Sequence, residues 1–150
     1  MQKNYTEKVL KSETWTLIDE VTLNYVFLST SYAELKSTYE ELLRLGKNKS
    51  LKQYDMRLMK FYDLQHKTIT LIRRLWLLIG ENVKDKKNQE VWEAIENFVW
   101  KNHDYSPQKA MKEIDDIMRK LTKLLTSKKL VNISSTIGKF KTSKKDMAIS

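Results

Sequence analysis

Residues 18–42 read IDEVTLNYVFLSTSYAELKSTYEEL, and this stretch carries the strongest periodic signal in the chain. Its apolar and aromatic side chains recur at spacings that alternate between three and four residues for more than three heptads. Side chains with that period line one face of a single α-helix. The members of this seam are Ile18, Val21, Tyr25, Leu28, Tyr32, Leu35, Tyr39 and Leu42.

The seam predicts one long helix from about Thr6 to Leu45, with Gly46 ending it in the left-handed conformation. Tyrosine takes most of the positions at which a dimeric zipper carries Ile or Val. Because buried phenol hydroxyls need polar partners, these tyrosines favour packing inside a helical bundle over a two-stranded coiled coil.

A second helix is predicted from Leu51 to Ile79, with Ser50 as its N-cap and Gly80 after its last residue. The connection from the first helix is short, and short connections place consecutive helices antiparallel. The two helices therefore form an αα-hairpin in which the longer first helix overhangs the second. Because the overhang leaves part of the apolar seam uncovered, we expect a homo-oligomer or a helical protein partner.

Two shorter helices are predicted after the hairpin. Asn88 can cap a helix that ends at about Trp100. Ser106 followed by Pro107 is typical of a helix start, with an N-cap residue before a proline at the first helical position. The helix that begins there is expected to end between residues 127 and 133.

The composition also favours an all-α fold, because three Gly and one Pro in 150 residues provide few turns. The complete prediction is an elongated antiparallel four-helix bundle with a long N-terminal αα-hairpin over residues 1–133. A basic, flexible tail follows at residues 134–150.

Several classes of protein are excluded by what the chain lacks. It has no Cys, so a thiol nucleophile, a disulfide and a cysteine metal site are all excluded. The longest uninterrupted apolar run, Leu75–Ile79, is far shorter than the roughly 20 residues of a membrane-spanning helix. The N-terminal residues include no apolar secretion segment. We therefore expect a cytoplasmic protein.

The formal net charge of +9 is concentrated near the C-terminus. Residues 1–50 have no net charge, residues 51–118 carry +1 and residues 119–150 carry +8. A terminal basic arm is typical of contact with nucleic acid, either DNA or RNA. The nine basic residues of this arm are Arg119, Lys120, Lys123, Lys128, Lys129, Lys139, Lys141, Lys144 and Lys145.

Two other interpretations of the basic arm stay open. Lysines near a helix C-terminus also complement the helix dipole, and a basic tail aids solubility. An acidic protein or an acidic membrane surface is the other alternative to nucleic acid.

The leading hypothesis is a non-enzymatic small helical binding protein, accessory or structural, whose basic C-terminal region engages nucleic acid. The alternative is a protein-interaction or membrane-surface-associated bundle, since the chain is similar in outline to small intracellular bacteriocin-immunity proteins. Those are Lys-rich helical bundles with a variable C-terminal segment. Trp15 and Trp100 lie outside the predicted apolar faces, and tryptophan is enriched at interface hot spots. They are therefore candidate partner-binding residues.

An acidic pattern gives a third hypothesis. Glu93 and Glu96, followed by Glu113 and Asp116, resemble the paired acids of the all-α nucleotide pyrophosphohydrolases. The resemblance implies that both pairs hold Mg²⁺ for attack on a nucleoside triphosphate. Helical-wheel positions place the four carboxylates mostly on the water-facing sides of their helices. No catalytic residue, metal ligand or cofactor is therefore assigned.

The two histidines give no catalytic signal either. His66 is expected on the surface or at the boundary of the second helix, and His103 in the loop before Ser106. Asp63 and His66 have the acid-x-x-His spacing that di-iron helix bundles use, but such a site needs a second pair of this kind, and His103 does not form one. Neither histidine has the neighbours of a nucleophilic site.

Overall fold

Four long helices make up most of the structure, a computed structural model that describes residues 14–47, 51–103 and 106–139. They are α2 (Leu17–Lys47), α3 (Leu51–Val83), α4 (Gln89–Trp100) and α5 (Pro107–Ser127). A short helix follows at residues 133–139. The described ranges contain no strand, so the all-α prediction is confirmed.

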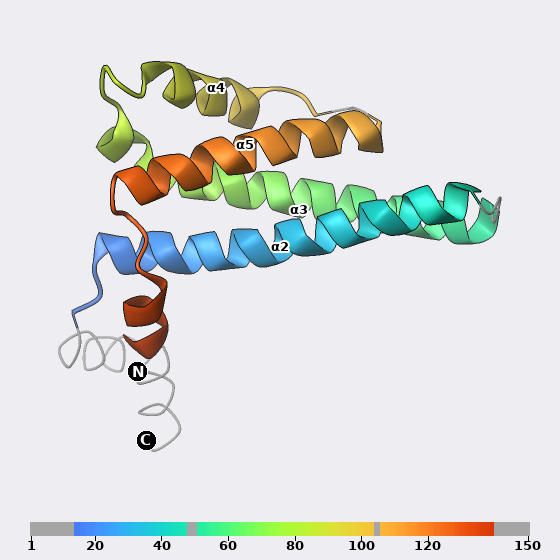
Figure 1. Cartoon of the computed structure of the whole chain (residues 1–150), viewed down its shortest axis with the longest axis horizontal. Helices are drawn as coiled ribbons and strands as arrows, with labels where there is room; N and C mark the ends of the chain where they lie inside the picture. Colours follow the sequence, from blue (N-terminus) through green and yellow to red (C-terminus); the bar gives the residue numbers. More distant parts are fainter. Residues whose placement is uncertain (1–13, 48–50, 104–105, 140–150) are drawn as a thin grey trace, which may run out of the picture.

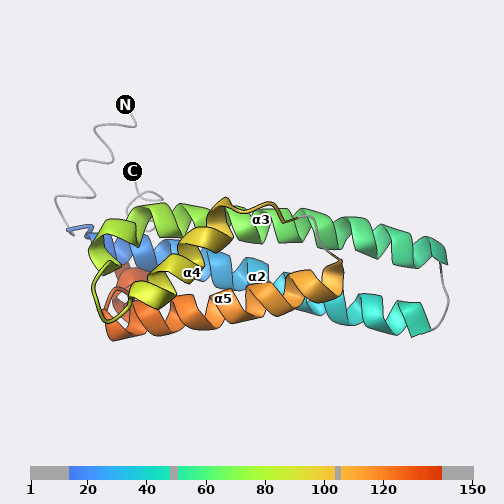
Figure 2. The same ribbon diagram turned by 90° about the horizontal axis from the view of Figure 1, so that it is seen from above.

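The α2–α3 hairpin is the longest unit of the fold, and its two helices pack closely along most of their length (Figure 1). The α5 helix lies against both of them, and α4 packs on α3 and α5 (Figure 2). The end of the hairpin at the α2–α3 connection projects past the start of α5 in both views. The core contains Val21, Leu28, Leu35, Phe61, Ile72, Leu75, Trp76, Ile79, Ile95, Ile114, Leu121 and Leu125.

The first helix begins later than predicted. Residues 14–16 are not helical, and α2 starts at Leu17. The Thr16 hydroxyl accepts the backbone N–H of Asp19 at 3.2 Å, and the Asp19 carboxylate accepts the backbone N–H of Thr16 at 2.9 Å. This reciprocal pair is a capping box, which satisfies two N–H groups and fixes the helix start. The predicted helical residues before Thr14 lie outside the described residues.

Two glycines that were predicted to end helices lie inside them. Gly46 belongs to α2, and α3 continues through Gly80 to Val83. No described glycine has a positive φ. A helical glycine costs only about 1 kcal/mol relative to alanine. Burial of Val83 at the end of α3 and the hydrogen bond from the Trp92 indole N–H to the Gly80 carbonyl (3.1 Å) favour the longer helix.

The helix starts predicted after the hairpin are confirmed. The α5 helix begins at Pro107, and the Ser106 hydroxyl accepts the backbone N–H of Lys109. Asn88 occupies the N-cap position of α4, but its side chain forms no capping hydrogen bond. Ser50, the predicted cap of α3, lies outside the described residues.

The first part of the predicted tail packs against the start of α2. Residues 134–139 belong to the short helix 133–139, so they differ from the flexible segment expected there. The buried Thr136 hydroxyl donates to the Asp19 carboxylate at 2.8 Å. The Lys139 ammonium donates to the same carboxylate at 2.7 Å and to the Thr14 carbonyl at 3.0 Å. Residues 140–150 of the predicted tail lie outside the described residues.

Two of the three tyrosines of the seam, Tyr25 and Tyr32, make polar contacts with α5. The hydroxyls of Tyr25 and Thr122 are 3.0 Å apart, and the Tyr32 hydroxyl donates to the Asp115 carboxylate. The leucine and valine side chains of the same seam are buried between α2 and its neighbours. The seam therefore makes two kinds of contact: its leucine and valine side chains pack in the core, and the hydroxyls of Tyr25 and Tyr32 make polar contacts with α5.

The Tyr32 contact predicts an alkaline titration. Burial and the hydrogen bond to Asp115 raise the pKa of Tyr32 to about 12. Since the unfolded pKa is about 10, the folded chain holds this proton more tightly. Stability from the contact is therefore complete below about pH 10 and is lost as the pH rises toward 12. In an absorbance titration of tyrosinate, the Tyr32→Phe variant should lack one tyrosine that titrates late in the wild type. If the two titration curves differ in no late-titrating group, the Tyr32–Asp115 contact is contradicted.

Candidate nucleic-acid interface

A cationic surface forms where the α3–α4 connection meets the end of α5. The Lys128 ammonium donates to the Asp85 carboxylate, which joins the two segments. This hydrogen bond, and one from the Asn88 backbone N–H, hold the pKa of Asp85 below its usual range. The Asp85 carboxyl group is therefore ionised at neutral pH, and its ion pair with Lys128 holds the α3–α4 connection against the end of α5.

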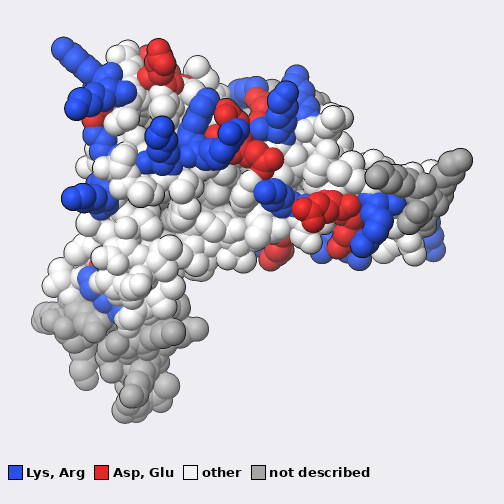
Figure 3. All heavy atoms as spheres, viewed as in Figure 1, with Lys and Arg blue, Asp and Glu red and all other residues white. Residues whose placement is uncertain are grey.

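Five exposed lysines belong to the two segments that this ion pair joins. Lys84, Lys86 and Lys87 come from the α3–α4 connection. Lys123 lies just before the last turn of α5, and Lys129 lies just after the end of the helix. We call these five residues the cationic end. Figure 3 shows Lys and Arg gathered at this end of the molecule, whereas basic and acidic side chains are mixed farther along α5.

The backbone at the end of α5 presents part of this surface. Lys129 has a φ of 54°, the left-handed conformation that commonly follows a helix. The N–H groups of Lys128, Lys129 and Leu130 donate back to carbonyls of the last helical turns. The chain therefore turns sharply at Lys129 and leaves its side chain exposed.

Several of the predicted nucleic-acid-binding residues form ion pairs away from the cationic end. Arg119 and Lys120 both pair with Asp116, and Lys139 pairs with the buried Asp19. Among the described residues of the basic arm, Lys123 and Lys129 form no ion pair with a carboxylate. Lys141, Lys144 and Lys145 lie outside the described residues.

The sequence prediction missed the three lysines of the α3–α4 connection, because they were counted within a neutral segment. The signal was present in the run Lys84-Asp85-Lys86-Lys87, where three cations surround one acid. Only the fold shows that Asp85 pairs with Lys128, which follows the last residue of α5. Lys84 also lies over the Trp92 ring, with its ammonium 4.7 Å from the ring centre.

The two candidate partner-binding tryptophans lie at different places. The Trp15 indole N–H donates to Glu20 at 2.8 Å, beside the start of α2, and the ring is half-buried. Trp100 lies at the end of α4 with 58% of its surface exposed, and its N–H donates to Glu96 at 3.1 Å. Trp100 is thus the more accessible of the two.

The four acids of the proposed magnesium pattern do not meet at one point. Glu96 accepts hydrogen bonds from the indoles of Trp76 and Trp100, and Glu93 accepts one from Gln89. Glu113 pairs with Lys101, and Asp116 pairs with Arg119 and Lys120. Within the described ranges, no group of three or more potential ligands could hold a metal ion.

Both histidines line one cavity, which the sequence did not predict. It lies between α3 and the segment that joins α4 to α5. His66 is exposed on α3, as expected, and His103 is half-buried in the connecting segment. The His103 Nε2 lies 2.6 Å from the Phe98 carbonyl, which can only accept, so this nitrogen carries the proton.

Comparison with known proteins gives no assignment, because no family model, curated protein or solved structure matches this chain. In the part of the chain that the structure describes, no helix is long and apolar enough to cross a membrane.

Proposed function

We propose that this chain is a non-enzymatic helical protein that binds nucleic acid through its cationic end and its basic C-terminal arm. The observation that carries the proposal is the meeting of two lysine-rich segments, far apart in the sequence, at the Asp85–Lys128 ion pair. Four exposed lysines of this end, Lys86, Lys87, Lys123 and Lys129, have no carboxylate in an ion pair among the described residues. Lysines with this arrangement attract phosphates without reading sequence.

The fold supports this proposal because the Asp85–Lys128 ion pair brings the two lysine-rich segments together. Each of these lysines repels the others, and a phosphate backbone relieves that repulsion while it releases its own counterions. The Asp85–Lys128 pair offsets part of the cost because it ties the two segments to each other. Contact with about four phosphates gives a slope of about −3.6 for log K against log salt.

The test is a titration of the full chain against labelled single-stranded and double-stranded DNA and RNA, followed by fluorescence anisotropy. A variant with Lys86, Lys87, Lys123 and Lys129 all replaced by Gln should bind about tenfold more weakly at about 50 mM salt. The matched control replaces four exposed lysines of the hairpin by Gln and so removes the same charge. These are Lys36, Lys52, Lys60 and Lys67.

The control should keep its affinity to within about twofold, because its lysines lie away from the cationic end. Equal losses in both variants show that only net charge matters, and they contradict a defined interface. Absence of binding to every nucleic acid at low salt contradicts the proposed function itself.

Self-association through the end of the hairpin is a second candidate function. The observation that favours it is a group of exposed apolar side chains near the α2–α3 connection, and this end of the hairpin projects past the start of α5 (Figure 2). A second copy of the chain offers the same apolar surface, which suits a symmetric contact. The group consists of Leu43, Leu51, Met56 and Met59.

Sedimentation velocity at micromolar concentration tests this second candidate. Met59→Lys should shift the chain to a monomer, because the charge would be buried in the contact. Leu77→Lys is the control, since Leu77 is almost as exposed as Met59 (65% against 71%) but lies toward the other end of α3. A monomeric wild-type chain contradicts self-association.

A further inference from the structure

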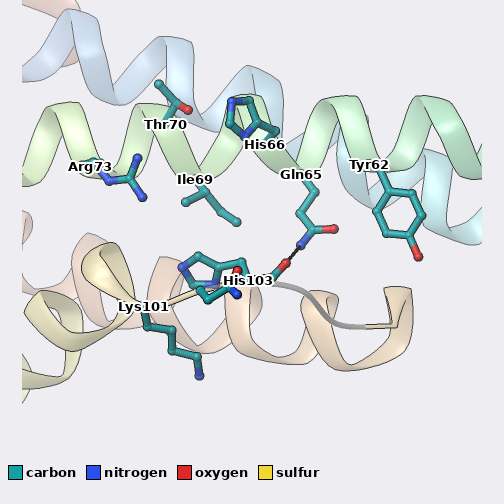
Figure 4. A pocket seen from close by; sticks show the side chains of 9 residues that line it. Tyr62, Gln65, His66, Ile69, Thr70, Arg73, Lys101 and His103 are labelled. Carbon is teal, nitrogen blue, oxygen red and sulfur yellow. Dashed lines mark hydrogen bonds between the residues drawn. The ribbon is translucent and has the colours of Figure 1, made fainter.

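A polar cavity of about 300 Å³ lies between the middle of α3 and the 101–103 segment. Figure 4 shows Gln65, Ile69 and Arg73 pointing from α3 toward that segment. Tyr62 lines the cavity one turn before Gln65. The volume lies at the lower end of the range for small-molecule sites.

The first feature of the cavity is a buried carbonyl without a donor. Gln65 is 4% exposed, and its amide Nε2 donates to the His103 carbonyl at 3.2 Å. Its Oε1 has no hydrogen-bond partner among the described residues. A buried acceptor left without a donor is costly, so a bound N–H group at this point is favourable.

The second feature is the positive charge of Arg73. Its Nε donates to the Val99 carbonyl at 2.9 Å, and its guanidinium carbon lies 5.7 Å from the centre of the Trp100 ring. These contacts fix the guanidinium, and no described carboxylate forms an ion pair with it. Burial lowers the pKa of His103, so that ring is neutral at pH 7 and adds no cation beside Arg73.

The spacing of these groups limits the class of ligand. Gln65 and Arg73 are eight residues apart on α3, which is about 12 Å along the helix axis. The buried Ile69 lies midway between them. Inorganic phosphate or an amino acid is too short to reach both polar groups. A nucleotide has N–H donors on its base and an anionic phosphate at its other end.

We propose that this cavity binds a nucleoside monophosphate unit, with the base against Gln65 and Tyr62 and the phosphate at Arg73. The Tyr62 ring offers a stacking surface, which every base accepts. Ile69 provides an apolar surface between the two polar ends. The same unit occurs as a free nucleotide and within a single strand, and the site is separate from the cationic end.

Calorimetric titration of the full chain with AMP, CMP, GMP and UMP tests the site. At least one nucleotide should bind, and inorganic phosphate or the matching nucleoside should bind at least about tenfold more weakly. Arg73→Met should weaken nucleotide binding about tenfold, because it removes the phosphate contact. Arg74→Met is the matched control, since Arg74 is exposed and does not line the cavity.

Gln65→Met introduces a side chain of similar volume. It should lower the affinity for the nucleotide that binds best and leave the affinity for inorganic phosphate unchanged. No nucleotide binding at millimolar concentration, or equal effects of Arg73→Met and Arg74→Met, overturns the proposal. A labelled hexanucleotide then identifies the source of the unit. Weaker hexanucleotide binding in Arg73→Met indicates a strand, and an unchanged affinity indicates a free nucleotide. Loss of this site leaves binding at the cationic end intact, so the two proposals fail separately.

Discussion

Replacing Trp76 with alanine is expected to lower the free energy of unfolding by about 4 kcal/mol. Trp76 is 2% exposed at the contact between α3 and α4, with its ring 5.5 Å from that of Trp92. Its indole N–H donates to the Glu96 carboxylate. The alanine variant leaves a large cavity and removes a donor to that carboxylate, and both changes destabilise the fold.

Trp100→Ala is the matched control, because its indole N–H donates to the other oxygen of Glu96. Most of the Trp100 surface is exposed, so its removal should cost less than about 1 kcal/mol. Urea unfolding followed by circular dichroism measures both variants. If the two alanine variants lose similar amounts of the free energy of unfolding, the packing of α4 on α3 at Trp76 is contradicted.

The second large effect is expected at Asp19, where alanine should lower the free energy of unfolding by about 3 kcal/mol. Asp19 is 2% exposed and accepts hydrogen bonds from Thr16, Thr136 and Lys139. Alanine removes the capping contact of α2 and leaves the Lys139 ammonium without its carboxylate. It therefore weakens the helix start and the contact of residues 133–139 with it.

Asp19→Asn separates these two roles. Asparagine can still accept the Thr16 N–H, but it carries no charge for Lys139. The asparagine variant should therefore lie between the wild type and the alanine variant in urea unfolding. Equal stability of Asp19→Ala and the wild type contradicts the docking of residues 133–139.

Asp19 also predicts the response to acid. Burial alone would raise the pKa of Asp19, but hydrogen bonds from Lys139, Thr16 and Thr136 lower it well below the usual range. The unfolded chain then binds this proton more readily, since an ordinary Asp has a pKa of about 3.9. The stabilisation from Asp19 is complete above about pH 5 and is lost progressively as the pH falls further. Between about pH 5 and pH 2, wild-type stability should fall more steeply than that of Asp19→Asn.

The helical fold could be predicted because its local signals agree with its packing. The leucine and valine positions of the seam are buried in α2, and Ser106 with Pro107 starts α5 as expected. The stop signal at Gly80 failed because the small intrinsic cost of a glycine inside a helix was outweighed by the burial of Val83. Thr16 and Asp19 form a capping box that the longer seam pattern obscured.

The candidate sites were harder to predict because they depend on distant residues. Asp19 and Lys139 are separated by 120 positions. Their ion pair could not be predicted because residues 134–150 were expected to form a flexible tail. The cavity unites the middle of α3 with the segment after α4, and its signal is a single buried amide. Sequence periodicity identifies faces of helices, whereas these contacts depend on how the faces meet.

Binding through the cationic end is tested most directly by the salt dependence of nucleic-acid binding for the wild-type chain and the two quadruple lysine variants. We expect a wild-type slope of about −3.6 for log K against log salt between about 50 mM and 200 mM. The slope should become shallower by about 0.9 for each phosphate contact that the cationic-end variant loses, and it should be unchanged in the hairpin control. A flat wild-type slope, or the same reduction in both variants, would contradict binding through the cationic end.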